Sequence, residues 1–256
     1  MLITPDDPPP VHIFNPAGRA SFLLLGDHAG NTVPRGLGQL GLGDEQLARH
    51  IAWDIGVAAL GEALATALDA VFIRQRYSRL VIDCNRDPHS PQAMAEASDG
   101  TAIPGNGALT PAARAARIAE VHAPYHAAIA AELERRDRAG HESVIVSLHS
   151  FTPVMGRDAR PWHIGILHDG GDARFALSCL RSLEGQRDLM IGNNQPYRMD
   201  ATDYTVPLHA YAARRPYVEI EMRQDLMGSA QGQGVCLAAV RGALEESWPP
   251  SHPPGG

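Results

Sequence analysis

The sequence predicts a single α/β domain whose mixed, mostly parallel sheet is flanked by helices. Short apolar runs alternate along the 256 residues with longer segments of helical period, and this alternation is typical of βαβ units. The short runs are uniformly apolar, as strands are when helices cover both faces of a sheet. The length suits one large domain, which we place at residues 21–247. Residues 1–20 are expected to form an N-terminal tail, and residues 248–256 a tail rich in proline and glycine.

Seven apolar runs are expected to form strands, and four longer segments are expected to form helices. The predicted strands are 22–25, 71–73, 80–82, 144–148, 164–167, 189–191 and 217–222. The predicted helices are 44–68, with an interruption near Trp53 and Asp54, then 111–139, 172–183 and 232–247.

The helix at 111–139 carries the clearest boundary signals. Thr110 is a good N-cap, proline follows at the first helical position, Gly140 is a typical stop, and Pro124 is where the helix would kink. Two segments rich in turn-forming residues, 87–109 and 152–161, are predicted to be long loops. Loops of that length in a compact domain usually form lids or the walls of a site.

Composition and charge favour a small-molecule partner. The formal charge is −7, with 22 basic and 29 acidic residues and no Lys/Arg run, so nothing indicates binding to nucleic acid or to an anionic membrane surface. The three cysteines lie far apart and form no CxxC, which suits a reducing cytoplasm. Without a signal sequence or an 18-residue apolar run, neither secretion nor membrane insertion is expected. The 12 histidines point to metal or acid/base chemistry.

Two histidines stand at the ends of predicted strands. His28 follows the strand at 22–25, and His149 follows the strand at 144–148. Ligands of α/β sheets collect beyond the carboxyl ends of strands, so the two rings can approach each other if their strands are neighbours. Two neutral imidazoles and one carboxylate make an open catalytic zinc site, and we expect one Zn²⁺ per chain. The alternative is that each histidine only caps its strand by hydrogen bonding.

The third ligand of such a site must be a carboxylate. Asp54 lies in an otherwise apolar helical stretch, where an unpaired ionised Asp is costly to bury, so it must cap a helix, pair with a cation or bind metal. Asp27 and Asn31 compete with it for this role. Asn31 is neutral and a poor zinc ligand, whereas Asp27 suits the task of orienting a histidine. We therefore predict that His28, Asp54 and His149 hold the metal.

Arg76, Arg79 and Arg86 lie within eleven residues of one another. An arginine fork binds a carboxylate in a bidentate fashion, and an adjacent asparagine amide adds a neutral donor. Asn85 and Arg86 are therefore a predicted clamp for an acidic substrate, and Asp83 would hold one of the arginines in place. The alternative is a structural ion-pair cluster that joins a strand to the next loop, and the spacing favours it nearly as well.

The strand predicted at 217–222 carries two glutamates. Strand alternation places Glu219, Glu221 and Arg223 on one face. A glutamate close to a metal-activated water can take its proton during attack and hand it to the leaving amine. Glu221 is nearer the strand end and is the predicted base. The alternative is that both glutamates are exposed partners of Arg223 on an edge strand.

Three further residues are candidates for substrate binding, namely Ser150, His209 and Arg223, although His209 could equally cap a helix that begins near it. His126, inside a long helix, is more often a packing histidine than a ligand. The chain contains no GxSxG, Walker, GxGxxG or HExxH motif, which removes the commonest serine hydrolase, nucleotide-binding and zincin interpretations.

With these residues laid out, the sequence from about residue 22 to about residue 242 resembles the N-formylglutamate amidohydrolase family. The matching stretches are 27–31 (DHAGN), 53–56 (WDIG), 78–87 (SRLVIDCNRD), 148–151 (LHSF), 194–197 (NQPY) with 204–206 (YTV), and 219–226 (EIEMRQDL). Each stretch alone would be a weak signal, but their order and spacing together are specific.

The resemblance implies a phosphorylase/hydrolase-like fold akin to zinc carboxypeptidases and aspartoacylases. In those relatives an Asn-Arg pair grips the substrate carboxylate, a second arginine polarises the scissile carbonyl, and a glutamate is the base. The matching positions are Asn85 with Arg86, then Arg76 or Arg79, and Glu221, and we take Arg79 as catalytic and Arg76 as substrate-binding. One position departs from the pattern, because the relatives place a zinc-binding Glu where this chain has Asn31.

These features lead to one functional hypothesis. The chain is expected to hydrolyse the amide bond of an N-acyl acidic amino acid such as N-formyl-L-glutamate, giving formate and the free amino acid, and the resemblance implies a place in histidine degradation. One alternative is a related zinc amidase or carboxypeptidase-like enzyme with a different N-acyl substrate. Another is a non-catalytic protein that binds an acidic metabolite through the arginine cluster.

Overall fold

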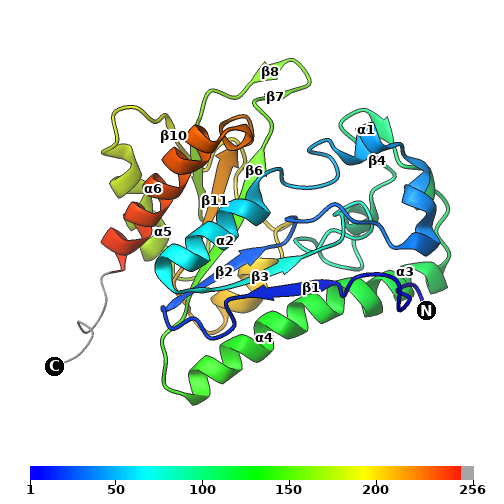
Figure 1. Cartoon of the computed structure of the whole chain (residues 1–256), viewed down its shortest axis with the longest axis horizontal. Helices are drawn as coiled ribbons and strands as arrows, with labels where there is room; N and C mark the ends of the chain where they lie inside the picture. The colour runs from blue at the N-terminus through cyan, green and yellow to red at the C-terminus, as the bar shows by residue number, and fades with distance from the viewer. Residues whose placement is uncertain (249–256) are drawn as a thin grey trace.

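A seven-stranded sheet lies between two layers of helices (Figure 1). The computed structural model describes residues 1–248. In order across the sheet, the strands are β1 (Val11–Phe14), β3 (Val71–Gln75), β2 (Phe22–Gly26), β6 (Val144–Phe151), β11 (Tyr217–Arg223), β9 (Ile164–Leu167) and β10 (Ile191–Asn193). The pairs β1–β3 and β11–β9 are antiparallel, and the other four neighbouring pairs are parallel. The predicted mixed, mostly parallel sheet flanked by helices is confirmed.

Helices cover both faces of this sheet (Figure 1). One face is covered by α2 (Val57–Leu68), α5 (Arg174–Glu184) and α6 (Ala230–Ser247), whose buried residues form one apolar cluster with alternate residues of β2, β6 and β11. The other face is covered by α4 (Ala123–Arg138), which buries Tyr125, Ile129 and Leu133. Burying one such large apolar side chain contributes about 1.5–3 kcal/mol, so the two clusters hold the sheet firmly between the helices.

The remaining helical segments lie mostly in the connections between the strands. Among them α1 (Asp44–Leu47) contributes Leu47 to a third apolar cluster, which also contains Tyr77 and Val81. The other segments are α3 (Pro111–Arg117), the 3-10 turns Arg35–Gly41, Pro91–Met94, Pro104–Asn106 and Leu226–Gly228, and the π-helical turns Ile118–His122 and Pro207–Tyr211. No helix in residues 1–248 combines the length and the apolar character that crossing a membrane requires.

Two predicted helices are interrupted where the sequence indicated. The segment 44–68 divides into α1 and α2, and Trp53 and Asp54 lie in the connection between them. The segment 111–139 divides into α3, the π-helical turn and α4. Pro124 has no N–H group, so it cannot donate the hydrogen bond that an α-helix would make to the Glu120 carbonyl. The π-helical turn Ile118–His122, just before this proline, accommodates the missing donor.

The predicted strand at 80–82 is wrong, because these residues form a turn. The Leu80 carbonyl accepts a hydrogen bond from the Asn106 amide at 3.0 Å, and the Val81 carbonyl accepts one from the buried Arg117 guanidinium at 2.9 Å. Side chains therefore take the carbonyls that a strand would offer to a neighbour. The apolar character of this run reflects burial in the third cluster and not membership of the sheet.

The structure also differs from the prediction in smaller ways, at the ends of the chain and in the long loops. Residues 11–14, within the expected N-terminal tail, form the edge strand β1. The expected tail at 248–256 lies outside the described residues after position 248. Each predicted long loop contains a short hairpin, formed by β4 (Ala97–Ser98) with β5 (Thr101–Ala102) and by β7 (Val154–Met155) with β8 (Asp158–Ala159). The run predicted at 189–191 yields a strand two residues later, as β10.

Gly30→Ala is expected to destabilise the protein by about 3 kcal/mol or more, at the upper end of the cost of overpacking. A methyl group at this position would lie 2.1 Å from the Arg76 carbonyl oxygen, and neither backbone can move away, because Thr32 N–H donates to that same oxygen at 3.2 Å. The matched control is Gly242→Ala in α6, where no atom lies within 4 Å and alanine favours the helix. Urea unfolding should give a lower midpoint for the first variant only; equal midpoints would contradict this packing.

Candidate active site

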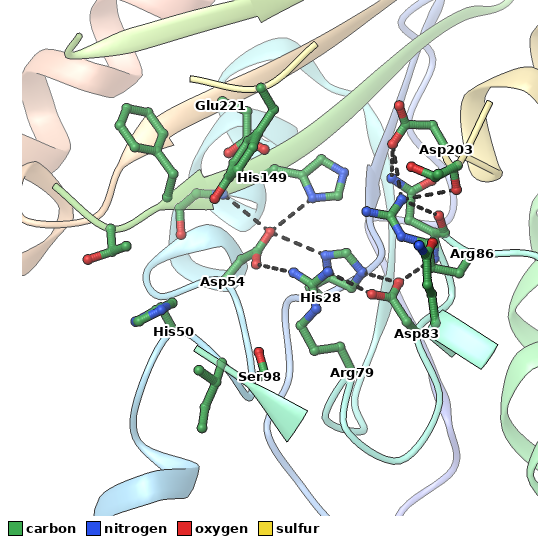
Figure 2. Close-up of a pocket in the computed structure, with 18 of the residues that line it drawn as sticks. His28, His50, Asp54, Arg79, Asp83, Arg86, Ser98, His149, Asp203 and Glu221 are labelled. Atoms are coloured by element: carbon green, nitrogen blue, oxygen red, sulfur yellow. Dashed lines mark hydrogen bonds and ion pairs between the residues drawn. The ribbon is translucent and has the colours of Figure 1, made fainter. Parts of the chain in front are cut away.

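A cavity of about 550 Å³ lies beyond the carboxyl ends of the central strands (Figure 2). This edge of the sheet is where α/β proteins bind their ligands. The strand β6 contributes His149, and β11 contributes Glu219 and Glu221. The hairpin β4–β5 supplies Ser98 and the hairpin β7–β8 supplies Met155, so both long loops do form walls of the cavity.

Two imidazoles and one carboxylate meet inside this cavity (Figure 2). Asp54 Oδ2 lies 2.9 Å from His149 Nδ1 and 3.5 Å from His28 Nδ1, and all three side chains are buried. His28 comes from the turn after β2 and His149 from β6, and these two strands are parallel neighbours whose carboxyl ends meet at one edge. The backbone N–H of Asp54 donates to the His28 carbonyl at 2.8 Å, which brings the third residue to the same point. These three residues form a group that could hold a metal ion.

The second nitrogen of each ring is fixed by a neighbour. His28 Nε2 lies 2.7 Å from Asp83 Oδ1. His149 Nε2 lies 3.0 Å from Ser147 Oγ and 3.6 Å from Asp27 Oδ2. Partners of this kind orient metal-binding histidines and set their tautomer. Among the described residues His28 Nδ1 has no hydrogen-bond partner although it is buried, so the donor set of two imidazole nitrogens and a carboxylate oxygen fits an open zinc site.

The electrostatics of this group also favour a cation. Burial by itself would raise the pKa of Asp54, but the His28 and His149 imidazoles hold it well below its usual range. Burial would likewise raise the pKa of Asp83, but Arg79 and His28 lower it well below the usual value. Burial and Arg79 lower the pKa of His28, whereas Asp83 and Asp54 raise it more strongly, so the net shift is upward. Carboxylates thus lie beside the ring nitrogens, and a divalent cation bound there would replace the protons that the rings otherwise carry.

The other two candidates for the third ligand have different partners. Asn31 donates its amide N–H to the Leu47 carbonyl at 3.3 Å. Asp27 accepts a hydrogen bond from the Tyr125 hydroxyl at 2.6 Å, and its second oxygen faces His149 from behind. Asp27 is therefore placed to orient a ring, and Asp54 is the carboxylate that faces the Nδ1 atoms of both rings.

Arg79 lies between Asp83 and Asp54, which belongs to the group that could hold a metal ion. Its Nη2 donates to Asp83 Oδ2 at 2.6 Å, and its Nη1 lies 3.5 Å from Asp54 Oδ1. The other oxygen of Asp83 contacts His28, so one carboxylate fixes both a guanidinium and an imidazole. Asp83 does hold one of the arginines in place, as the sequence suggested. Arg79 also lines the cavity, which places a fixed positive charge beside the metal-binding group.

The predicted clamp of Asn85 and Arg86 lies in the cavity wall. Asp203 of the chain itself already binds part of Arg86 (Figure 2). Arg86 Nη1 donates to Asp203 Oδ1 at 3.2 Å and to the carbonyls of Asn85 and Thr202. The Asn85 amide donates to Asp203 at 3.3 Å, and Asn85 Oδ1 accepts two backbone N–H groups of the same loop. Within residues 1–248 no acceptor is hydrogen-bonded to Nε or Nη2 of Arg86, so that edge of the guanidinium is open to a ligand.

Glu219 and Glu221 also line the cavity, opposite Ser147 and His149 in the register of β11 with β6. Both side chains are buried, and Oε2 of each has no hydrogen-bond partner within the described part of the chain. Burial raises the pKa of Glu219 to about 7 and that of Glu221 to about 8. Carboxyl groups with such pKa values exchange protons near neutrality, as acid/base catalysis requires. The alternative of two exposed glutamates on an edge strand is wrong, because β11 lies inside the sheet.

The remaining predicted residues divide between the cavity and the surrounding structure. Ser150 lines the cavity, and its hydroxyl donates to the Ile55 carbonyl at 3.0 Å. Arg76, His209 and Arg223 are not among the lining residues. Arg223 pairs with Asp225 at 2.8 Å. His209 lies 3.0 Å from His126, on a helical turn behind the cavity wall.

Arg76 directly follows the end of β3 and does not line the cavity. Within β3, Phe72 faces the cluster under α2, and Arg74 pairs with Glu62 of that helix at 3.1 Å. Arg76 lies near His12, whose pKa is lowered by burial and further by Arg74 and Arg76.

Asp203 and Tyr197 are among the residues of the cavity wall that sequence reasoning missed. The Tyr197 hydroxyl accepts a hydrogen bond from Arg160 Nη1 at 2.7 Å, and the Arg160 guanidinium lies 4.6 Å from the centre of its ring. The available signal was their position, because Tyr197 ends the stretch 194–197 and Asp203 immediately precedes the stretch 204–206, both of which match the family pattern.

Comparisons with known proteins give a consistent result. The model of the N-formylglutamate amidohydrolase family matches residues 20–227. The crystal structure of a gene product from Agrobacterium tumefaciens superposes with a TM-score of 0.93, with 36% sequence identity and coverage of 96% of this chain and 98% of that one. An N-formylglutamate amidohydrolase from Ralstonia eutropha has the same fold, with a TM-score of 0.67, 21% identity, and coverage of 94% of this chain and 97% of that one. The comparison with curated proteins gives no match.

In the metal-free protein, Glu221→Gln is expected to increase stability at pH 9 by on the order of a few kcal/mol, with little change at pH 5. The folded-state pKa of Glu221 is raised from 4.5 to about 8, so its favourable contribution is fully present below pH 4.5 and is lost as the pH rises through about 8. Glutamine stays neutral throughout and avoids that loss. Chemical unfolding at the two pH values measures the effect, with Glu245→Gln on the surface of α6 as control. Equal gains at both pH values would contradict the burial of an ionisable Glu221.

Proposed function

The chain belongs to the N-formylglutamate amidohydrolase family, and from this premise we propose that it is a zinc-dependent enzyme that hydrolyses N-formyl-L-glutamate or a closely related N-acyl acidic amino acid. We place its catalytic domain at residues 21–247. One observation carries the proposal: the buried His28–Asp54–His149 group shares a cavity with the carboxyl group of Glu221 and the open edge of Arg86. A metal site, a base and a cation for the substrate carboxylate are the parts that this hydrolysis needs.

The proposed zinc ligands are Nδ1 of His28, Nδ1 of His149 and Oδ2 of Asp54. When bound, the metal supplies a Lewis acid that polarises the acyl carbonyl and lowers the pKa of a water molecule. Asp83 and Ser147 keep the two rings turned toward the metal position, because each contacts the nitrogen on the far side of a ring.

Glu221 is the proposed acid/base. It takes a proton from the attacking water and returns it to the amine nitrogen as the amide C–N bond breaks, so the water oxygen leaves in the carboxylic acid and the proton in the amine. Glu221 lies opposite His149 in the register of β11 with β6, whereas Glu219 lies opposite Ser147. Glu221 is therefore the glutamate that stands directly across from a proposed metal ligand.

Two arginines are proposed to handle the negative charges of the reaction. Nε and Nη2 of Arg86 offer a planar edge to a substrate carboxylate, since Nη1 is already fixed by Asp203 and two carbonyls. Asn85 braces the loop that carries Asp203. Arg79, beside Asp54, is placed to stabilise the charge that develops on the acyl oxygen. The substrate then spans the cavity with its carboxylate at Arg86 and its amide at the metal-binding group.

The direct test is amine release from N-acyl amino acids by zinc-loaded protein. N-formyl-L-glutamate is expected to react at least about tenfold faster than N-formyl-L-glutamine, because loss of the side-chain carboxylate leaves the open edge of Arg86 without an acceptor. N-acetyl-L-glutamate tests the size of the acyl group in parallel. Tight binding of these acids without turnover would indicate a binding protein, and turnover of neutral substrates alone would refute the acidic specificity.

Glu221→Gln is expected to lower kcat by about 10²–10⁴-fold while about one zinc per chain is retained, because general acid–base catalysis contributes factors of that size. Glu219→Gln is the matched comparison on the same strand face, and its loss should be smaller. Turnover and zinc content of the two variants are measured together. Full activity of Glu221→Gln, with a large loss in Glu219→Gln, would move the catalytic role to Glu219.

A further inference from the structure

Three imidazoles lie directly behind the wall that carries Asn85 and Arg86, outside the group that could hold metal. His122 ends the π-helical turn before α4, His126 lies one helical turn later in α4, and His209 lies in the turn Pro207–Tyr211. The rings of His122 and His126 are 4.5 Å apart, and those of His126 and His209 are stacked at 5.3 Å. His122 and His126 are buried. None of the three has a role in the mechanism proposed above.

The hydrogen bonds of these rings define what each nitrogen does. His122 Nε2 lies 3.1 Å from the Arg86 carbonyl oxygen, and His126 Nε2 lies 2.9 Å from the Cys84 carbonyl oxygen. Because a carbonyl oxygen only accepts, both rings must donate from Nε2. If neutral, His126 then has an acceptor at Nδ1, which faces His209 Nε2 at 3.0 Å. Burial lowers the pKa of His126 to about 3 and that of His209 to about 4, so both rings are neutral at physiological pH.

The two carbonyls held in this way flank Asn85 on either side along the chain. The side chains of Asn85 and Arg86 line the cavity, while the carbonyls of residues 84 and 86 are bound by imidazoles on the opposite side. Thr205 adds a third donor, from its hydroxyl to the Cys84 carbonyl at 3.3 Å. The guanidinium of Arg86 is in turn bound to the Asn85 carbonyl at 2.9 Å. Its place in the cavity therefore depends directly on where this backbone segment lies.

We propose that His122 and His126 are positioning residues for substrate recognition, which hold the backbone of residues 84–86 so that the open edge of Arg86 faces the substrate carboxylate. This proposal rests on the proposed function. It assigns to the two histidines a role in binding and none in chemistry, since they neither line the cavity nor contact the metal-binding group. Loss of the His122 N–H removes the side-chain donor to the Arg86 carbonyl, and loss of the His126 N–H leaves the Cys84 carbonyl with only the longer bond from Thr205, so in either case the segment is held less firmly.

His126→Leu removes the donor and keeps an apolar side chain in the space. We expect KM for N-formyl-L-glutamate to rise about tenfold with kcat changed less than about threefold, because the interaction lost is one of substrate binding and not of the transition state alone. Zinc content should be unchanged. His126→Gln restores a side-chain N–H and should return KM toward the value of the unmodified protein. His141→Leu, at an exposed histidine, is the matched control.

A second measurement keeps the test independent of turnover. Amide hydrogen exchange of the peptide covering residues 83–87 should accelerate in His126→Leu and return to normal in His126→Gln, whereas general destabilisation would accelerate exchange throughout the protein. If His126→Leu fails to fold, His122→Leu, which breaks only the bond to the Arg86 carbonyl, takes its place in both measurements.

The outcomes separate the two proposals. A fall in kcat at constant KM, equal effects of leucine and glutamine, or unchanged exchange at residues 83–87 would each overturn the positioning role. Absence of turnover in every form, including the unmodified protein, would refute the proposed function. In that case the exchange measurement still decides whether the histidines fix this segment.

Discussion

The architecture of the site depends on one carboxylate oxygen, Asp54 Oδ2, that two buried imidazoles face at 2.9 and 3.5 Å. Charged and polar groups buried this deeply are costly unless each is paired. Each of these buried groups has a partner of opposite charge or a hydrogen-bond partner, because Asp83 contacts His28 and Arg79 in turn neutralises Asp83. Among the described residues this network leaves His28 Nδ1 without a hydrogen-bond partner, and a metal ion held by His28, Asp54 and His149 would satisfy it. Such an ion would link metal binding to the integrity of this part of the core.

The sheet delivers these groups through its topology. β2, β6 and β11 are consecutive parallel strands, so all three end at the same edge, where His28, His149 and Glu221 lie. Period-two alternation then sends the apolar residues of β6 and β11 to the helices α2, α5 and α6, and the polar ones to the opposite face. The same alternation explains why the two glutamates share a face with His149, and why the acid/base group is buried among polar neighbours.

The sequence allowed the central part of this site to be predicted, because its signals are local. A histidine at the end of a strand and an aspartate in an apolar stretch are both polar residues in surroundings that favour apolar ones. Such exceptions to the local pattern are expected at functional sites. For residues 80–82 the local signal was misleading. They are apolar because they are buried in the third cluster, and the Val81 carbonyl is hydrogen-bonded to Arg117 and not to a strand. Arg76 and Arg223 were predicted to bind substrate but do not line the cavity, because each lies near the end of a strand, where a neighbouring group can take the guanidinium, as Asp225 does for Arg223. For Asp203 the only signal was its position just before the stretch 204–206.

The division between strands and loops has a consequence for specificity. The residues assigned to chemistry lie on strands of the sheet, at their ends or in turns bonded directly to them, where a small displacement would disturb several buried charges. Arg86, Asp203 and Tyr197 lie instead in connecting segments, which can change without repacking the sheet. Substrate preference can thus shift within this fold while the metal-binding group stays fixed. His122 and His126 limit that freedom at one place, because their hydrogen bonds to the Arg86 and Cys84 carbonyls tie the segment bearing Arg86 to α4 and the helical turn before it.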